Sequence, residues 1–229
     1  GIRALEKISQ NFDQVYMIPG NHDLYYKDKR DVHGTEWAKH LPNVNVLNDW
    51  HEEGDCIFVP WLVGDEHKKI KKANAKYMFG HFELPHFKMN AMVEMPDHGE
   101  LKHDHFDGIE QVYSGHFHLR QRQKNIYYIG NAFPHNFSDA GDSERGCMIL
   151  EWGGEEQFHA WPDQPLYNTF NLSYLIDNAD SILKPKMHVR VPLDIEISYE
   201  EANYIKETFV EKYKLRELAL MSSKKSEVG

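Results

Sequence analysis

Three segments of this 229-residue chain share one pattern, which is a strand-like run, a glycine, and then a side chain able to bind a metal ion. They are "YMIPGNHD" at 16–23, "YMFGH" at 77–81 and "QVYSGHFH" at 111–118. Glycine permits a sharp turn at the end of a strand. Sites in layered α/β folds gather where the strands of one sheet end. We therefore expect an α/β fold in which these three loops meet.

Shorter patterns predict the remaining elements of the first two thirds of the chain. Apolar residues at helical spacing predict a helix over 2–10, and two further helices are expected over 34–41 and 65–75. Apolar and β-branched runs bounded by turn residues predict strands. These strands are expected over 44–47, 56–62, 126–130, 147–152 and 157–161.

The character of the chain changes near residue 163, where proline-bearing segments begin. We expect a linker over 164–185, followed by a strand at 188–195. Ser198 and Glu201 form a capping box, which predicts the start of a helix with an apolar face. Residues 186–221 thus resemble a small β-α module with an incomplete sheet, and the polar tail, 222–229, is expected to be disordered.

Composition limits the class of protein. The hydrophobic content of 41% supports a core, and no apolar run is long enough to span a membrane. The N-terminal segment does not look like a signal peptide, and the two cysteines lie in apolar runs that predict buried, reduced thiols. We therefore expect a soluble, cytoplasmic protein that does not bind membranes.

The net charge of −10 argues against a surface that binds nucleic acid broadly, because phosphate contacts require Lys and Arg. It does not exclude a nuclease, because bound divalent cations would reverse the sign of the field at the site. The lysine-rich run at 67–76 is interpreted as the solvated face of a helix rather than a DNA contact.

Histidine placement points to a transition metal. If "GHFH" is extended, His116 and His118 point to the same side and Phe117 to the other. Imidazole and the carbonyl oxygen of an Asn suit Mn, Fe or Zn better than calcium. We expect His81, His116 and His118 to be ligands. Most of the other histidines are expected to be packed or exposed, including the pair in "KHDHFDG" at 102–108.

The motifs "GNHD", "GH" and "GHFH", in this order, resemble the calcineurin-like metallophosphoesterases. The resemblance implies a four-layer β-sandwich flanked by helices and a site with two divalent transition metals, with two Mn²⁺ favoured. Asn21, His81 and His116 would bind one metal, and His118 the other. His22 would stabilise the transition state or protonate the leaving oxygen, and Asp23 would orient the His22 ring.

The segment "YIGNAFPHNFSDAGDSERG" at 128–146 resembles the SbcD-type exonucleases, which are nuclease subunits of SbcCD and Mre/Rad-type DNA repair and recombination complexes. The tailed-phage version is the most similar. The resemblance implies DNA as substrate, a coiled-coil ATPase partner like SbcC, and a homodimer. It also implies a nuclease core over 1–163, a linker over 164–185 and a partial capping module over 186–221.

Two motifs of that family, D-x-H and G-D-x-x-D, do not occur in residues 1–19. We therefore expect this chain alone to bind metal weakly and to hydrolyse little, with the other ligands on a separate piece or on a longer chain. Two alternatives remain. One is the same chemistry on a phosphoprotein or a nucleotide, and the other is a module of this fold that binds without turnover.

Overall fold

The computed structural model describes residues 1–89 and 93–222. The chain divides into two compact units, Gly1–Asn131 and Ala132–Gly229, and each is described by itself. The core expected over 1–163 crosses this division. The disordered tail expected over 222–229 lies outside the described residues, except for residue 222.

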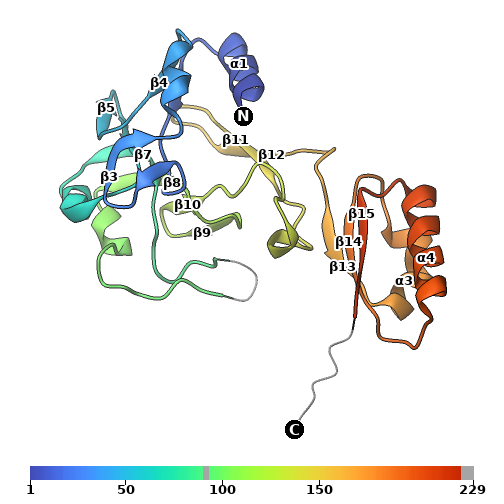
Figure 1. Cartoon of the computed structure of the whole chain (residues 1–229). Coiled ribbons are helices and arrows are strands. Elements are labelled where there is room, and N and C mark those ends of the chain that lie inside the picture. Colours follow the sequence, from blue (N-terminus) through green and yellow to red (C-terminus); the bar gives the residue numbers. More distant parts are fainter. Residues whose placement is uncertain (90–92, 223–229) are drawn as a thin grey trace. The chain divides into compact units, whose positions relative to one another are not determined.

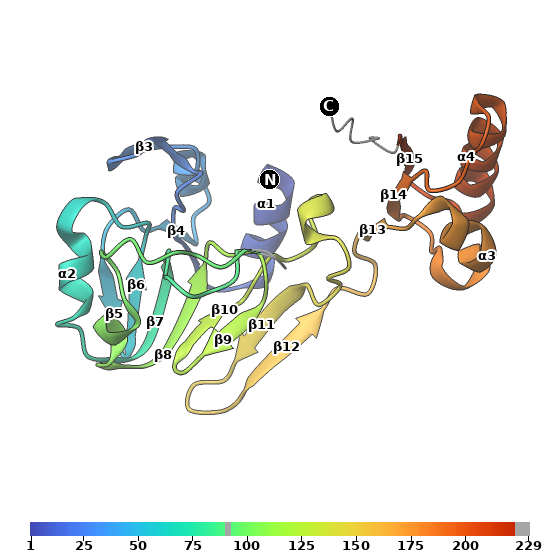
Figure 2. The ribbon, with the colours of Figure 1, turned by 90° about the horizontal axis from the view of Figure 1, so that it is seen from below.

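The first unit is built on a mixed six-stranded sheet with the order β5-β6-β7-β8-β10-β9 (Figures 1 and 2). The four inner strands are parallel, and each of the outer two is antiparallel to its neighbour. The expected α/β class is confirmed. The strands are β5 (His51–Glu53), β6 (Cys56–Val59), β7 (Ala75–His81), β8 (Ile109–Gly115), β9 (Gln121–Gln123) and β10 (Ile126–Tyr128).

Period-two alternation gives this sheet two apolar faces. On one face, residues directly opposite each other across the inner strands, such as Met78 and Val112, are fully buried in the main core. On the other face, Phe58, Phe79 and Tyr113 are aligned across three strands. Their rings stack with centroids 5.3 and 5.6 Å apart. This packing fixes the register of the strands whose ends carry the candidate site.

Two smaller sheets and several short helices complete the first unit. Strand β1 (Val15–Met17) pairs in parallel with β4 (Val44–Val46), and β2 (Leu24–Tyr26) pairs antiparallel with β3 (Lys29–His33). The helices are α1 (Ile2–Asn11), α2 (His67–Ile70) and the 3-10 helices η1 (Glu36–His40), η2 (Gly64–Glu66) and η3 (His103–Phe106).

The helix expected over 65–75 is much shorter than predicted. Its α-helical part is His67–Ile70, and β7 already begins at Ala75. Ile70 is the buried residue of α2. Because the following residues, Lys71, Lys72 and Ala73, place little apolar surface in the core, nothing stabilises further helical turns.

The second unit contains the hairpin β11 (Gly146–Leu150) and β12 (Glu156–Ala160), the 3-10 helix η4 (Phe137–Asp139), and a three-stranded parallel sheet. That sheet has the order β13 (Tyr167–Thr169), β14 (His188–Pro192), β15 (Glu217–Met221). Helices α3 (Leu172–Ile182) and α4 (Tyr199–Tyr213) accompany it. Buried Leu172, Leu175 and Val189 contribute to its separate core.

The C-terminal expectations are partly corrected by this arrangement. The segment 164–185 is not an unstructured linker, because it contains β13 and α3, whose Leu172, Leu175 and Ala179 lie on one buried face. Strand β15 completes a sheet that was expected to be incomplete. The capping box is confirmed, since the Glu201 backbone N–H donates to Ser198 Oγ and the Ser198 backbone N–H to the Glu201 carboxylate.

Two smaller expectations have different outcomes. Cys56 is a buried free thiol as predicted, but Cys147 is free and exposed, because its side chain lies on the outward face of β11. Within the described residues, none of the helices has the length and apolar character that a membrane span requires.

Candidate active site

The three glycine-marked loops meet at one end of the central sheet. His81 ends β7 and is paired with Gly115 at the end of β8, so His116 follows at the same edge. The His81 and His116 ring centroids lie 5.3 Å apart. Asn21, from the "GNHD" loop, places its Oδ1 atom 3.0 Å from His81 Nε2. Asn21, His81 and His116 are therefore neighbours, as the sequence predicted.

The other two histidines of the motifs lie close enough to act on this group. His22 interacts electrostatically with both His81 and His116, and His118 interacts with His116. The position of the His118 backbone is fixed by a hydrogen bond, which its carbonyl oxygen accepts from the Asn131 backbone N–H. The turn before Asn131 uses Gly130 at φ +76°, where a Cβ would lie 2.8 Å from that same oxygen.

Glycines on both sides make room for the His81 ring. A Cβ added at Gly20 would lie 2.7 Å from His81 Cε1, and one added at Gly115 would lie 2.9 Å from His81 Nδ1. Neither glycine has a positive φ, so the limit is space rather than backbone conformation. Gly20 and Gly115 therefore leave room for the His81 imidazole between their two loops.

The substitution Gly115→Ala tests this close packing. The added methyl group requires the His81 ring to move, so we expect Mn²⁺ binding by the chain to weaken at least about tenfold. The free energy of unfolding should fall by about 1–3 kcal/mol, because Gly20 lies close on the other side of the ring and leaves it little room to move. Isothermal titration with Mn²⁺ and denaturant unfolding measure the two effects. Gly34→Ala is the control, since a Cβ there would have its nearest neighbour at 3.7 Å, and an equal loss in both variants would contradict the argument.

The "GHFH" segment is not extended as predicted. Strand β8 ends at Gly115, and His116 has φ +93°, a region that L-residues rarely occupy. Phe117 does pack the other way, buried with its ring centroid 4.7 Å from that of Tyr128. Strain of this kind persists where the surrounding packing imposes it and is common at functional sites. Here it turns the His116 ring toward His81.

Glu83 belongs to the site, although the sequence analysis did not identify it. Its Oε2 atom lies 3.0 Å from His116 Nε2. The backbone between His81 and Glu83 is fixed at Phe82, whose N–H donates to Ser114 Oγ and whose carbonyl oxygen accepts from the Tyr128 hydroxyl. The signal in the sequence was the H-x-E spacing in "GHFEL" directly after the strand.

The Asp23 carboxylate is hydrogen-bonded within its own loop, and its expected role in orienting His22 stays a prediction. Its Oδ2 atom accepts from the Gly20 backbone N–H at 2.7 Å, and its own N–H donates to the Gly20 carbonyl oxygen at 3.1 Å. Among the hydrogen bonds of the described residues, the Asp23 carboxylate has no bond to the exposed His22 ring. Asp23 therefore closes the loop that presents Asn21, because a short polar side chain can satisfy the backbone of a tight turn.

Burial keeps the two central imidazoles neutral. Burial, followed by the charges of His116 and His22, lowers the pKa of His81 to about 4. Burial also lowers the pKa of His116, although the nearby Glu83 carboxylate opposes this shift. Neutral imidazole is the form that binds a metal, so both rings have the required protonation state at neutral pH.

The donors fit a divalent transition metal in kind. Asn21 Oδ1 and His81 Nε2 are hydrogen-bonded to each other at the separation of two ligands on one ion, and His116 is adjacent. The set is small, however. Across residues 1–89 and 93–222, no group of three or more His, Cys, Asp or Glu side chains is placed to hold a metal ion. The candidate site has three possible metal donors only if the Asn21 amide oxygen is counted with His81 and His116.

Trp61 covers the two imidazoles, and sequence analysis gave it no role. Its ring centroid lies 5.3 Å from that of His116 and 5.9 Å from that of His81. Its backbone N–H donates to the Pro19 carbonyl oxygen, and its own carbonyl oxygen accepts from Arg30. The Trp61 loop is thus tied both to the "GNHD" loop and to β3.

Arg30 is the buried centre of that connection. It is 9% exposed and makes two hydrogen bonds of 2.6 and 2.7 Å to the Glu66 carboxylate. It also donates to the carbonyl oxygens of Asn48 and Trp61. A planar guanidinium suits such paired contacts with a carboxylate, and here one side chain fixes the position of three segments.

The Arg30–Glu66 pair predicts an acid dependence of stability. Burial acts to raise the pKa of Glu66, but hydrogen bonds from Arg30 and the Val63 N–H outweigh it and lower this pKa below its ordinary value of 4.5. A carboxyl with a lowered folded-state pKa stabilises the fold above its unfolded-state pKa, and this contribution is lost as the pH falls through the folded-state value.

We therefore expect the unfolding free energies of the unmodified chain and of Glu66→Gln to differ by a constant amount from about pH 7 to about pH 5. The difference should shrink below about pH 4.5. Denaturant unfolding at a series of pH values measures it. A difference that stays constant down to about pH 3 would show that Glu66 does not titrate with a lowered pKa.

Comparisons with known proteins find similarity to a nuclease subunit and to a protein named as a phosphoesterase. No family model matches the chain. It is 31% identical over 146 residues to "Exonuclease subunit 1" of Enterobacteria phage T4, an alignment that covers 60% of this chain and 42% of that protein. It is 26% identical over 245 aligned positions to "Putative phosphoesterase 244L" of Invertebrate iridescent virus 6, covering 90% of this chain and 80% of that protein. The chain thus spans less than half the length of the phage subunit.

Proposed function

We propose that this chain is a divalent-metal-dependent phosphodiester hydrolase that acts on DNA as a nuclease subunit of the SbcD type. The observation that carries the proposal is the meeting of Asn21, His81 and His116 where the parallel inner strands of the central sheet end. The similarity to an exonuclease subunit and to a protein named as a phosphoesterase supports it. The calcineurin-like sandwich, with its four layers, is part of the same proposal.

Asn21, His81 and His116 would hold one divalent metal, and His118 would contribute to a second. Two Mn²⁺ ions are the favoured pair. When bound, such ions supply positive charge that stabilises the transition state of phosphoester hydrolysis and lower the pKa of water. The protein's own contribution is to keep both imidazoles neutral and to fix their orientation through Gly20, Gly115 and the Phe82 backbone.

His22 is the proposed proton donor. His22 is exposed and interacts electrostatically with His81 and His116. It lies on the loop that is closed by the Asp23 hydrogen bond. From this place an imidazole N–H can donate a hydrogen bond to a phosphate oxygen in the transition state, or an imidazolium can protonate the leaving oxygen. Asp23 supports His22 through the shape of the loop rather than through a hydrogen bond to its ring.

The assembly implied by the SbcD resemblance is also proposed. It comprises DNA, a coiled-coil ATPase partner like SbcC, and a homodimer, with the C-terminal three-stranded sheet and its two helices as the capping module. The word "subunit" in the name of the phage relative is consistent with a complex.

One observation favours a second candidate, a binding module without turnover. It is the shortage of carboxylate and imidazole donors among the described residues. A non-catalytic chain would keep the fold and bind DNA or a protein partner with no hydrolysis. The two candidates differ in a single measurable property, which is metal-dependent turnover.

The test is hydrolysis of end-labelled duplex DNA and of bis-p-nitrophenyl phosphate at high enzyme concentration, with Mn²⁺ or with EDTA. We expect slow turnover that requires Mn²⁺ and is lost when Asn21 or His116 is replaced by Leu. Turnover that persists in both variants would come from a contaminant or another site. No turnover, combined with intact DNA binding, would favour the non-catalytic module.

A further inference from the structure

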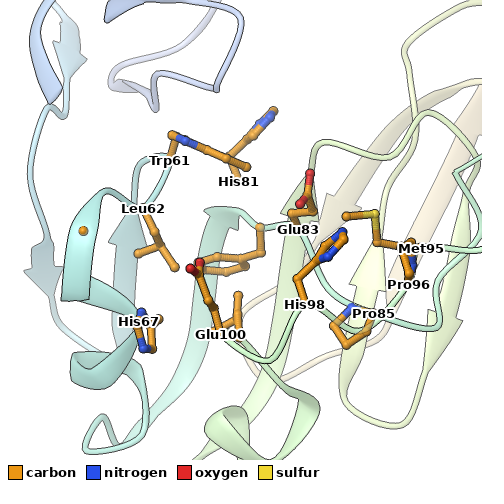
Figure 3. A pocket seen from close by; sticks show the side chains of 13 residues that line it. Trp61, Leu62, His67, His81, Glu83, Pro85, Met95, Pro96, His98 and Glu100 are labelled. Carbon is orange, nitrogen blue, oxygen red and sulfur yellow. The ribbon is translucent and has the colours of Figure 1, made fainter. Parts of the chain in front are cut away.

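A pocket of about 230 Å³ lies directly beside the candidate metal site, and none of the roles assigned above uses it. His81 and Glu83 form its boundary with that site (Figure 3). Figure 3 shows Trp61 next to His81 at one end of the pocket, and Glu83, Met95 and His98 along one side. A group that occupies this pocket is therefore adjacent to the place where a phosphate would react.

The walls of the pocket combine apolar and polar side chains, and the apolar part is aromatic and aliphatic. Trp61, Leu62, Phe82, Met95 and Leu101 line it, and Phe82 is fully buried behind the surface. Such a lining favours a flat, uncharged ring, because apolar and aromatic surfaces gain by stacking and by excluding water. A purine or pyrimidine base is small enough for a cavity of this volume.

The charges in the pocket exclude phosphate and point to particular bases. Glu83 and Glu100 both contribute carboxylates to the lining. The two carboxylates repel a phosphate group, and the other titratable side chains of the lining are His67, His81 and His98. We therefore place the reacting phosphate on the metal side of His81 and an uncharged group in the pocket. Carboxylates accept hydrogen bonds, and the exocyclic amino groups of adenine, cytosine and guanine donate them. Thymine has no such amino group.

We propose that this pocket binds a nucleobase of the DNA strand next to the scissile phosphate, with Trp61 as the stacking wall and Glu100 as acceptor for an exocyclic amino group. The proposal rests on the proposed nuclease function and adds a base preference to it. Stacking on Trp61 would anchor the strand end while the phosphate lies over Asn21, His81 and His116. Glu83 is shared by the pocket and the candidate metal site, since it lines the pocket and contacts His116.

The experiment measures binding of uncharged nucleosides to the whole chain in EDTA, by saturation-transfer NMR titration. Deoxyadenosine, deoxycytidine and thymidine are compared, and neither metal nor hydrolysis is involved. We expect deoxyadenosine and deoxycytidine to bind more tightly than thymidine. Trp61→Leu should weaken deoxyadenosine binding by about tenfold, within the roughly 5- to 150-fold range of base–aromatic stacking. Trp61→Phe should retain most of the affinity.

Two variants provide the controls. Trp152→Leu removes an exposed tryptophan of the second unit and should leave nucleoside binding unchanged. Glu100→Gln changes an exposed residue, and we expect it to reduce the preference for amino-bearing bases while binding itself persists. If Trp61→Leu fails to fold, as judged by circular dichroism, Trp61→Phe and Glu100→Gln carry the test.

Several results would overturn the proposal. These are absence of nucleoside binding, equal affinity in Trp61→Leu and Trp152→Leu, no preference between deoxyadenosine and thymidine, and binding of phenol as tight as that of deoxyadenosine. The last result would indicate a pocket for an aromatic side chain of a protein substrate. Nucleoside binding as expected without Mn²⁺-dependent turnover would refute the nuclease function alone, and turnover without nucleoside binding would refute the pocket alone.

Discussion

Replacing His81 by Leu should lower the proposed Mn²⁺-dependent hydrolysis of bis-p-nitrophenyl phosphate by about 100-fold or more, because it removes a proposed metal ligand and its share of transition-state charge stabilisation. The free energy of unfolding should stay the same or rise slightly. The His81 ring is half-buried, and desolvation lowers its pKa to about 4, so its surroundings already disfavour the charged form. An apolar side chain of similar size is therefore tolerated.

This opposite effect on activity and stability distinguishes a functional residue from a structural one. Denaturant unfolding and steady-state rates, measured on the same preparation, give both values. His40→Leu is the matched control, since His40 is exposed at the end of η1. A marked loss of stability in His81→Leu, or equal rates in the two variants, would mean that His81 is a packing residue.

Replacing Arg30 by Met should destabilise the first unit by about 3 kcal/mol, the lower end of the range for breaking a buried ion pair. The side chain of Arg30 is 8% exposed and that of Glu66 is 38% exposed, so solvent screens part of the charge left behind. The loss also leaves the carbonyl oxygens of Asn48 and Trp61 without their donor. Denaturant unfolding followed by circular dichroism measures the change.

Arg30→Met should also weaken metal binding at the candidate site, because Arg30 fixes the position of the Trp61 loop. Lys68→Ala is the control. It breaks an ion pair with Asp65 whose two side chains are 65% and 79% exposed, and should cost less than about 1 kcal/mol. If Arg30→Met changes the free energy of unfolding by no more than Lys68→Ala, Arg30 does not act as a buried structural centre.

The convergence of the motif residues could be predicted because it depends on local signals and one topological rule. A glycine after a strand marks each loop, and adjacent parallel strands end at the same edge of a sheet. Those two facts place His81 beside His116 without knowledge of any contact. The capping box of α4 was predictable for the same reason, since its two partners are three residues apart.

The contacts that the sequence did not reveal join distant positions. Arg30 reaches Glu66, and Glu83 reaches His116, 33 residues further along the chain. The positive φ of His116 is also imposed by surrounding packing, so an argument from extended geometry failed there. Helix α3 did carry a periodic pattern in Leu172, Leu175 and Ala179, but the flanking prolines favoured a linker.

Binding of one divalent metal ion by Asn21, His81 and His116 is the basis of the proposed function. The most direct measurement is a crystal of this chain grown with Mn²⁺ and recorded at a wavelength where Mn scatters anomalously. We expect an anomalous peak within about 2.3 Å of Asn21 Oδ1, His81 Nε2 and a ring nitrogen of His116. A crystal with Mn²⁺ elsewhere on the protein, and the Asn21–His81 hydrogen bond intact with no peak between these side chains, would contradict it.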